Sequence, residues 1–144
     1  MELVVAFALN SENQFEKKHF GDAEKYNIYT LKDDNCVLIS EETNTFKDLD
    51  ETHVHGSKKK GESIIQFLKS KDVSALVSKQ FGANIKIISK HFVPVIIHDE
   101  SIQEVTNTLL KHLKWVHEES QSQAENYKLF SINNGILKSV IDKV

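Results

Sequence analysis

Residues 72–99 contain the pattern that most restricts how this chain can fold. Two short apolar runs rich in β-branched residues, 73–77 and 93–97, are separated by a brief amphipathic segment with helical spacing. Two buried strands with such a connection form a parallel βαβ unit, with a right-handed crossover as the strong default. Ligands of parallel sheets gather at the carboxyl ends of the strands. We therefore expect any pocket to be lined in part by the residues that follow these runs: Lys79, Gln80, Phe81, Gly82, Asn84, His98 and Asp99.

The segments before this unit predict three strands and one helix. Residues 2–9 are almost continuously apolar, as in a central strand. Residues 26–31 and 36–40 flank a polar turn, which is typical of an antiparallel hairpin. The polar connection 41–52 is expected to be irregular. Apolar spacing then predicts a helix from Gly61 to about Ser70, packed on one face of the sheet.

The chain after residue 99 predicts a further helix and an apolar tail. Ser101 and Glu104 have the spacing of a capping box, and the helix that they open is expected to run to about Glu119. The element order is βββαβαβα, in an α/β fold with a mixed sheet of about five strands. We divide the chain into an α/β domain at 1–119 and a C-terminal extension at 120–144. The extension docks on its own domain or on a partner chain, where it would support a homodimer, and its apolar pattern fits either a strand or a helix.

Composition restricts the class of protein. The 144 residues are enough for one sizeable core. No apolar run approaches the about 20 residues of a membrane span, and the first residues form a strand pattern rather than a basic leader. We therefore expect a cytoplasmic protein without membrane association. The net charge is −3 and all 18 basic residues are lysine, which argues against nucleic-acid binding. The single cysteine, Cys36, excludes an intramolecular disulfide and an all-cysteine metal site within one chain.

Several short motifs occur in an order that resembles a known family. The segment His19-Phe20-Gly21-Asp22-Ala23, followed by Tyr26-Asn27-Ile28-Tyr29, resembles the HFGxA…(F/Y)xIY signature of the dinitrogenase iron–molybdenum cofactor biosynthesis family, the NifX-like proteins. His55-Gly56 resembles the family's HG segment. Residues 72–77 and 81–84 are similar to its VDxVI…(I/M)GPNA stretch. The resemblance covers roughly residues 1–114.

This resemblance implies both a fold and a function. The implied fold is a ribonuclease H-like three-layer arrangement, with helices on both faces of the sheet. The implied function is non-catalytic binding or transfer of an iron–sulfur or iron–molybdenum cluster or its precursor, exchanged with a donor or acceptor protein. The expected metal ligands are His19, His53 and His55, with Cys36 as a further candidate, because neutral imidazole and thiolate suit iron. The positions expected to contact the cluster are Gly21, Gly56, Gly82 and Asn84, since glycine at a helix start or turn leaves backbone amides open to an anion.

The residues also support other interpretations. His19 could fix its own loop by hydrogen bonding, with His53 and His55 solvated, and each glycine could serve backbone conformation alone. Cys36 fits a small core residue of its strand, and the run 58–60 of three lysines fits a solvated helix face. The alternative function is a cofactor-free interaction or regulatory module that uses the apolar tail.

An enzyme is not expected from these residues. The first strand carries no carboxylate between Leu3 and Leu9, where two-metal hydrolysis on this fold would need one. The chain also has no nucleophile elbow and no HExxH motif. The sequence therefore favours a binding protein over a catalyst.

Overall fold

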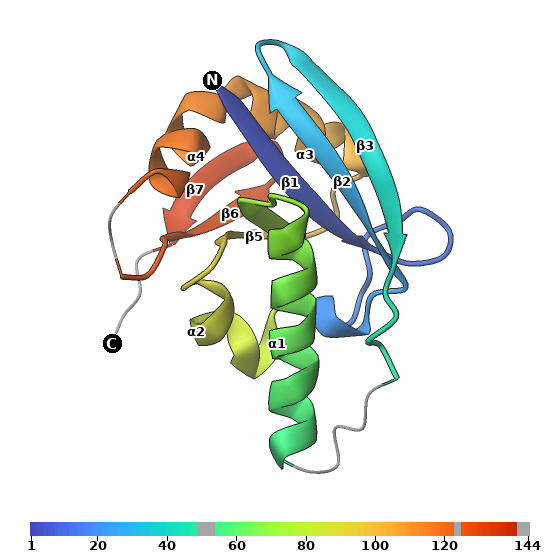
Figure 1. Cartoon of the computed structure of the whole chain (residues 1–144). Coiled ribbons are helices and arrows are strands. Elements are labelled where there is room, and N and C mark those ends of the chain that lie inside the picture. The colour runs from blue at the N-terminus through green and yellow to red at the C-terminus, as the bar shows by residue number, and fades with distance from the viewer. Residues whose placement is uncertain (49–53, 123–124, 141–144) are drawn as a thin grey trace.

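The βαβ unit predicted from residues 72–99 lies in the middle of the sheet (Figure 1). The computed structural model describes residues 1–48, 54–122 and 125–140, with the backbone alone described at 54–58. Strands β4 (Ala75–Ser78) and β5 (Val93–Ile97) pair in parallel. The connection between them contains the 3₁₀ turn η2 (Gly82–Asn84) and the short helix α2 (Ile85–Ile88). The predicted unit is therefore confirmed, including its short helix.

Within the described residues, seven strands form one mixed sheet in the order β3-β2-β1-β4-β5-β6-β7. The other strands are β1 (Glu2–Leu9), β2 (Lys25–Lys32), β3 (Asn35–Thr43), β6 (Leu129–Asn133) and β7 (Ile136–Val140). Strands β1, β4, β5 and β6 run parallel, while β2 and β3 on one side and β7 on the other pair antiparallel with their neighbours. The α/β class and the mixed sheet follow from this pairing.

The expected strand number of about five is too low, because the C-terminal tail supplies two more. Residues of β6 pair in parallel with β5, and β6 and β7 form an antiparallel hairpin. Asn134 and Gly135 join these strands with φ angles of 52° and 76°. Two successive positive φ angles are the requirement of a type I′ hairpin turn, and Asn-Gly is the preferred pair for it. Residues 129–140 therefore belong to the same sheet as the rest of the chain.

Helices cover both faces of the sheet and make three layers (Figure 1). Helix α1 (Val54–Ser70) lies with α2 on one face, and α3 (Ile102–Lys111) and α4 (Leu113–Ser120) lie on the other. Alternate residues of β1 divide between two core clusters. The cluster under α1 and α2 includes Ala6, Ala8, Phe20, Tyr26, Ile64 and Leu68. The cluster under α3 and α4 includes Val5, Phe7, Val95, Leu109, Val116 and Phe130.

Two helix predictions need correction. Helix α1 begins at Val54 rather than at Gly61, so the lysine run and Gly56 lie in its first turns. The single helix expected from Ser101 to about Glu119 is two helices, which meet at His112 with φ −114° and ψ 25°. The capping box is confirmed, because Glu104 N–H donates to the Ser101 hydroxyl and Ser101 N–H donates to the Glu104 carboxylate, both at 3.1 Å.

The predicted bounds of the strands agree better with the structure than the predicted bounds of the helices. The first strand has the expected bounds, and β2 differs by one residue at each end. Strand β3 continues to Thr43, three residues into the acidic segment that was expected to be irregular. A register shift between Ile28 and Tyr29 lets the pairing with β2 continue to this point.

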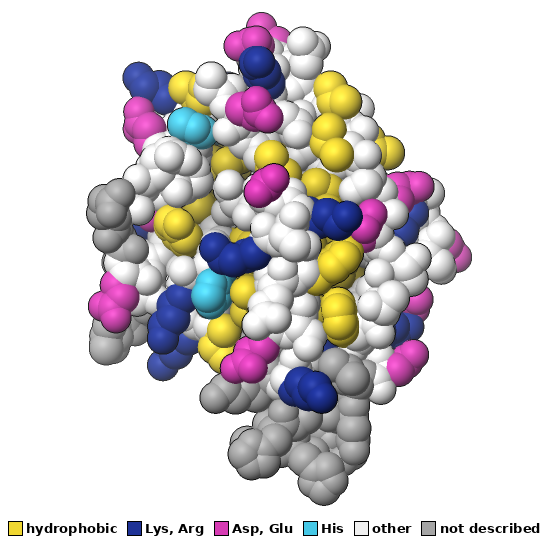
Figure 2. Space-filling model, viewed as in Figure 1, with side chains coloured by type: hydrophobic (Ala, Val, Ile, Leu, Met, Phe, Trp, Pro, Cys, Tyr) yellow, Lys and Arg dark blue, Asp and Glu magenta, His cyan; other side chains and the backbone are white. Residues whose placement is uncertain are grey.

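The surface of the described residues mixes charges of both signs with apolar side chains, as seen on the face that carries α1 (Figure 2). Val37, Leu38 and Ile39 of the edge strand β3 are exposed. No helix among the described residues combines the length and apolar character that crossing a membrane requires.

Candidate functional site

Hydrogen bonds join the loop between β1 and β2 to the loop after β4. Phe20 N–H donates to the Gln80 carbonyl at 2.9 Å, and the Gln80 side-chain amide donates to the Lys17 carbonyl at 3.0 Å. Phe20 is fully buried, and the buried Tyr26 hydroxyl donates to its carbonyl at 2.7 Å. These contacts place the 3₁₀ turn η1 (Phe20–Asp22) at the carboxyl edge of the parallel strands, where ligands of α/β sheets bind.

His19 is held at both of its ring nitrogens. It is the N-cap of η1, and Gly21 N–H donates to its Nδ1 at 3.1 Å. Its Nε2 lies 3.1 Å from a carboxylate oxygen of Asp22. Because Nδ1 accepts a hydrogen bond, the proton of the neutral ring is on Nε2 and points to Asp22. The loop-fixing hydrogen bonds considered from the sequence are therefore present, and the side chain remains 28% exposed.

Asp22 joins His19 to a buried lysine of α1. Lys60 Nζ donates to the other carboxylate oxygen of Asp22 at 2.7 Å, and the Lys60 side chain is only 3% exposed. Burial by itself raises the pKa of Asp22, but the hydrogen bond from Lys60 and the charge of Lys60 outweigh it, so that this pKa is below its usual value. The prediction that the lysine run is a solvated face is wrong at Lys60.

Replacing Asp22 with Asn should lower the free energy of unfolding at pH 7 by about 1–2 kcal/mol, between the values for exposed and buried ion pairs. The folded-state pKa of Asp22 is lowered, so its stabilisation is present above the unfolded-state pKa of about 3.9. It is lost as the pH falls through the lower folded-state pKa. Denaturant titrations from pH 7 to pH 2.5 should therefore show a difference between wild type and Asp22→Asn that shrinks below about pH 4.

The exposed Asp34, in the β2–β3 turn, provides the control for this comparison. The Asp34→Asn variant should follow the wild-type curve throughout the same titration. An Asp22→Asn curve that stays parallel to wild type down to pH 2.5 would show that the pair with Lys60 contributes nothing.

Two glycines of the predicted site pack directly against His19. A Cβ atom at Gly21 would lie 3.1 Å from His19 Cε1 and 3.2 Å from Nδ1, so any side chain there would push the ring away. Gly82 has φ +62°, which favours glycine, and a Cβ atom there would lie 3.7 Å from His19 Cβ. Asn84 ends the same 3₁₀ turn, two residues further on, and is half-buried. The structure therefore brings His19, Gly21 and Gly82 together.

The remaining predicted positions are not part of this described cluster. His53 lies outside the described residues, and for His55 only a backbone position in the first turn of α1 is described. Gly56 is the next residue of that turn. Cys36 packs against the cluster under α3 and α4, on the other face of the sheet from Phe20. Burial raises the pKa of its thiol, although a hydrogen bond with Thr106 partly offsets this, so Cys36 is a poor thiolate ligand.

The described side chains do not form a complete metal site. Among the described residues, no group of three or more His, Cys, Asp or Glu side chains is arranged to hold a metal ion. Of the three predicted ligands, His19 alone has a side chain among the described residues. Asp22 and Lys60 are the site residues that the sequence reasoning missed. The helical spacing of Lys60, Ile64 and Leu68, four residues apart, is a signal that could have shown Lys60 facing inward.

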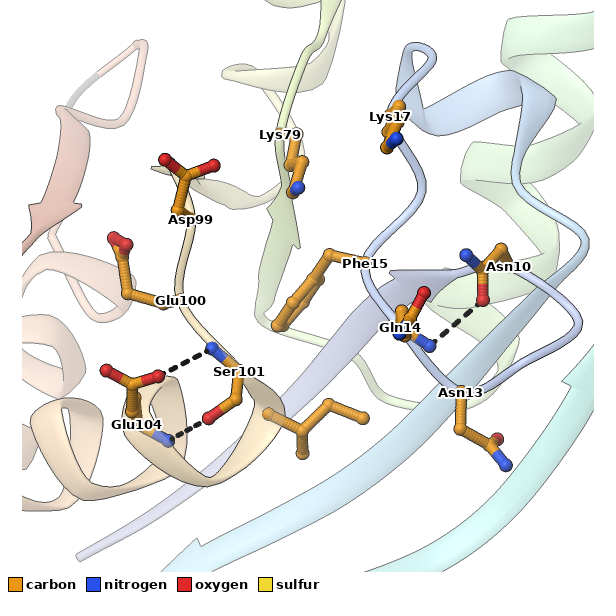
Figure 3. Close-up of a pocket in the computed structure, with 11 residues that line it drawn as sticks. Asn10, Asn13, Gln14, Phe15, Lys17, Lys79, Asp99, Glu100, Ser101 and Glu104 are labelled. Atoms are coloured by element: carbon orange, nitrogen blue, oxygen red, sulfur yellow. Dashed lines mark hydrogen bonds between the residues drawn. The ribbon is translucent and has the colours of Figure 1, made fainter.

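A cavity of about 360 Å³ lies at the carboxyl ends of β1, β4 and β5 (Figure 3). Lys79 and Asp99, two of the residues expected from the βαβ pattern, line it. The prediction that these strand ends border a pocket is thus confirmed for these two residues. The cavity is on the α3 face, and neither His19 nor Gly82 lines it.

Comparisons with known proteins give one result. The model of a family described as dinitrogenase iron-molybdenum cofactor matches residues 1–112. No curated protein matches the chain. The matched region contains β1 to β5 and the whole of α3. It includes η1, η2 and the strand ends around both the His19 loop and the cavity.

Proposed function

The chain belongs to the dinitrogenase iron–molybdenum cofactor family, and from this premise we propose that it binds or transfers a metal cluster. The proposed cargo is an iron–sulfur or iron–molybdenum cluster, or its precursor, carried without catalysis. The observation that supports this best is the setting of His19: a partly exposed imidazole at the carboxyl edge of the sheet, oriented by a carboxylate. Metal-ligating histidines commonly have this carboxylate partner.

The hydrogen bonds of His19 favour one nitrogen as the ligand. With the proton on Nε2 facing Asp22, the lone pair of Nδ1 is the one available to a metal ion. That lone pair now accepts from Gly21 N–H at 3.1 Å, a bond whose loss costs about 1 kcal/mol. We propose that a cluster iron replaces this contact. The released Gly21 N–H would then be able to donate to a cluster sulfide, and hydrogen bonds to the sulfurs adjust the reduction potential of such clusters.

Further ligands must come from elsewhere, since His19 has no second ligand beside it among the described residues. We propose His53 and His55 for this role, with Gly56, Gly82 and Asn84 shaping the pocket. Neither histidine's side chain is among those described. A partner chain, such as a cluster donor or acceptor, or exogenous thiols would supply the remaining ligands, because the chain has one cysteine.

The family membership also supports the finer fold assignment. We propose that residues 1–119 form a ribonuclease H-like domain, with β6 and β7 added by the extension. Two observations support this assignment. Strands β1, β2 and β3 form successive antiparallel pairs, and β4 and β5, each preceded by a helix, then continue the sheet in parallel with β1. Helices cover both faces of this sheet.

Cluster uptake is the experiment that tests the function. Full-length protein is purified without oxygen and incubated with ferrous iron and sulfide, and then with a preformed iron–molybdenum cluster. We expect the protein to bind iron and acid-labile sulfide in amounts close to stoichiometric with the chain. The loaded protein should also show a charge-transfer absorption band. His19→Ala should weaken cluster affinity at least tenfold, and it should lower the free energy of unfolding by only about 1 kcal/mol, because it removes the cap of η1 and the contact with Asp22 but leaves the core intact. His98→Ala, which removes an exposed histidine elsewhere, is the matched control.

Two results would contradict this proposal at different levels. Unchanged uptake by His19→Ala would exclude His19 as a ligand. A colourless wild-type protein that also refuses a supplied cluster would exclude the cluster function. It would favour a cofactor-free interaction module, for which the exposed Ile136 and Val140 on the edge strand β7 are the supporting observation.

A further inference from the structure

The cavity at the carboxyl ends of β1, β4 and β5 has features of a binding site separate from the His19 loop. Its walls come from segments far apart in the sequence: the loop after β1, the end of β4, and the turn that leads from β5 into α3. The residues that line it are Asn10, Asn13, Gln14, Phe15, Lys17, Lys79, Asp99, Glu100, Ser101, Ile102 and Glu104. Its volume of about 360 Å³ is within the range of small-molecule sites.

Two lysines of this cavity are available to an anionic group. Lys17 comes from the loop after β1, and Lys79 follows the last residue of β4. Neither ammonium has an ion-pair or hydrogen-bond partner within the part of the chain that the structure describes. Lys79 is also half-buried, so its charge is partly withdrawn from water. A carboxylate or phosphate placed between these lysines would gain charge-assisted hydrogen bonds.

The opposite wall carries carboxylates. Glu100 is only 8% exposed, yet its single hydrogen bond within the described residues is a 3.3 Å contact from His98 N–H. Asp99 has no cationic partner among the described side chains. A buried carboxylate without a nearby positive charge is costly, so this wall favours an ammonium group. The α3 N-terminus does not serve as an anion site, since Ser101 and Glu104 already cap it.

Charged and amide side chains surround an apolar floor. Figure 3 shows Asp99, Glu100 and Glu104 on one side of the Phe15 ring, Lys17 with the side-chain amides of the loop after β1 on the other, and Lys79 between Asp99 and Lys17. Phe15 is 4% exposed and packs on Phe7, with ring centroids 5.3 Å apart, so this floor is continuous with the core under α3 and α4. A ligand that fits this arrangement has charged ends of opposite sign and an aliphatic middle.

We propose that this cavity binds a small zwitterion of the amino-acid class, with its carboxylate at Lys17 and Lys79 and its ammonium at Asp99 and Glu100. Methylene groups of the ligand lie over Phe15 and Ile102. This site does not depend on the proposed cluster function, because none of its lining residues is a proposed cluster ligand.

Matched probes of equal size test the proposal on full-length, metal-free protein. 4-Aminobutyrate carries both charges, butyrate carries only the anion, and butylammonium carries only the cation. Titrations followed by ¹H–¹⁵N NMR should give saturable shifts at the amides of Lys79, Asp99 and their neighbours. We expect 4-aminobutyrate to bind at least about tenfold more tightly than either single-charge probe, the effect of one added charge-assisted contact. Glycine and 6-aminohexanoate then measure the preferred separation of the charges.

Variants locate the two ends of the ligand. Lys79→Met and Asp99→Asn should each weaken 4-aminobutyrate binding about tenfold. Lys79→Met should leave butylammonium binding unchanged, and Asp99→Asn should leave butyrate binding unchanged. Lys86→Met, an exposed lysine on α2 on the other face, and His19→Ala should have no effect. Equal affinities for the three probes, shifts that map away from the cavity, or no binding of any zwitterion would each overturn the proposal.

Discussion

A chain shortened to residues 1–122 is expected to lose its cooperative unfolding transition. The deletion removes β6 and β7 and thereby exposes the edge of β5, a nearly fully buried apolar strand. It also removes Phe130, Ile132 and Leu137, which are at most 5% exposed, from the cluster under α3 and α4. Each large core side chain contributes about 2–5 kcal/mol, so the summed loss is comparable to the whole stability of a domain. Thermal unfolding followed by circular dichroism and calorimetry measures the effect.

A surface substitution in the removed segment serves as the control. It shows whether the stability is lost because core side chains are removed or because any change in the tail destabilises the protein. Ile136 is 56% exposed on the edge strand, so Ile136→Ser should change the free energy of unfolding by less than about 0.5 kcal/mol. A shortened chain that still unfolds cooperatively near the wild-type temperature would show that residues 123–144 are an addition and not part of the core. It would also favour the interpretation of the tail as a segment that binds a partner.

Replacing Phe20 with Ala is expected to lower the free energy of unfolding by about 3–5 kcal/mol. Phe20 is fully buried beneath α1, with its ring centroid 6.0 Å from that of Phe81. Its backbone groups bond to Tyr26 and Gln80, so the side chain anchors the loop that presents His19. Loss of the ring leaves a cavity at the base of the proposed cluster site. Denaturant titration measures the stability, and the cluster-uptake assay measures the consequence for His19.

Two further variants keep this prediction testable if Phe20→Ala does not fold. Phe20→Leu retains most of the apolar volume and should remain folded, with reduced cluster uptake if His19 acts from this loop. Phe67→Ala removes a half-buried ring of α1 and should destabilise the protein less than Phe20→Ala. A Phe20→Ala protein as stable as wild type would contradict the anchoring role.

Much of the fold was predictable because it follows from local periodicity. The bounds of β1, the βαβ unit and the capping box at Ser101 and Glu104 were read from apolar spacing and cap residues. The two C-terminal strands were left open between strand and helix, although Asn134-Gly135 between two apolar runs is the usual mark of a hairpin. The sequence could not place them in the sheet because the partner of β6 is β5, more than 30 residues earlier in the chain, and no local pattern identifies a distant partner.

The site was predictable in its residue types but not in its connections. His19, Gly21 and Gly82 were named from motif resemblance, and they do pack together. The ion pair between Asp22 and Lys60 joins residues 38 positions apart, and in the sequence Lys60 is one of three adjacent lysines. Its position as the inward-facing member depends on where α1 begins, which the sequence placed too late.

The sequence alone determined most of the elements before residue 112 and their order. Periodicity, caps and turn residues act over a few neighbouring residues, and so they can be read directly from the chain. Only the tertiary structure decided which polar groups meet: that Asp22 lies between His19 and Lys60, and that Lys17 and Lys79 share a cavity with Asp99 and Glu100. These contacts join distant segments, and their energy depends on burial, which exists only once the sheet and its helical layers are assembled.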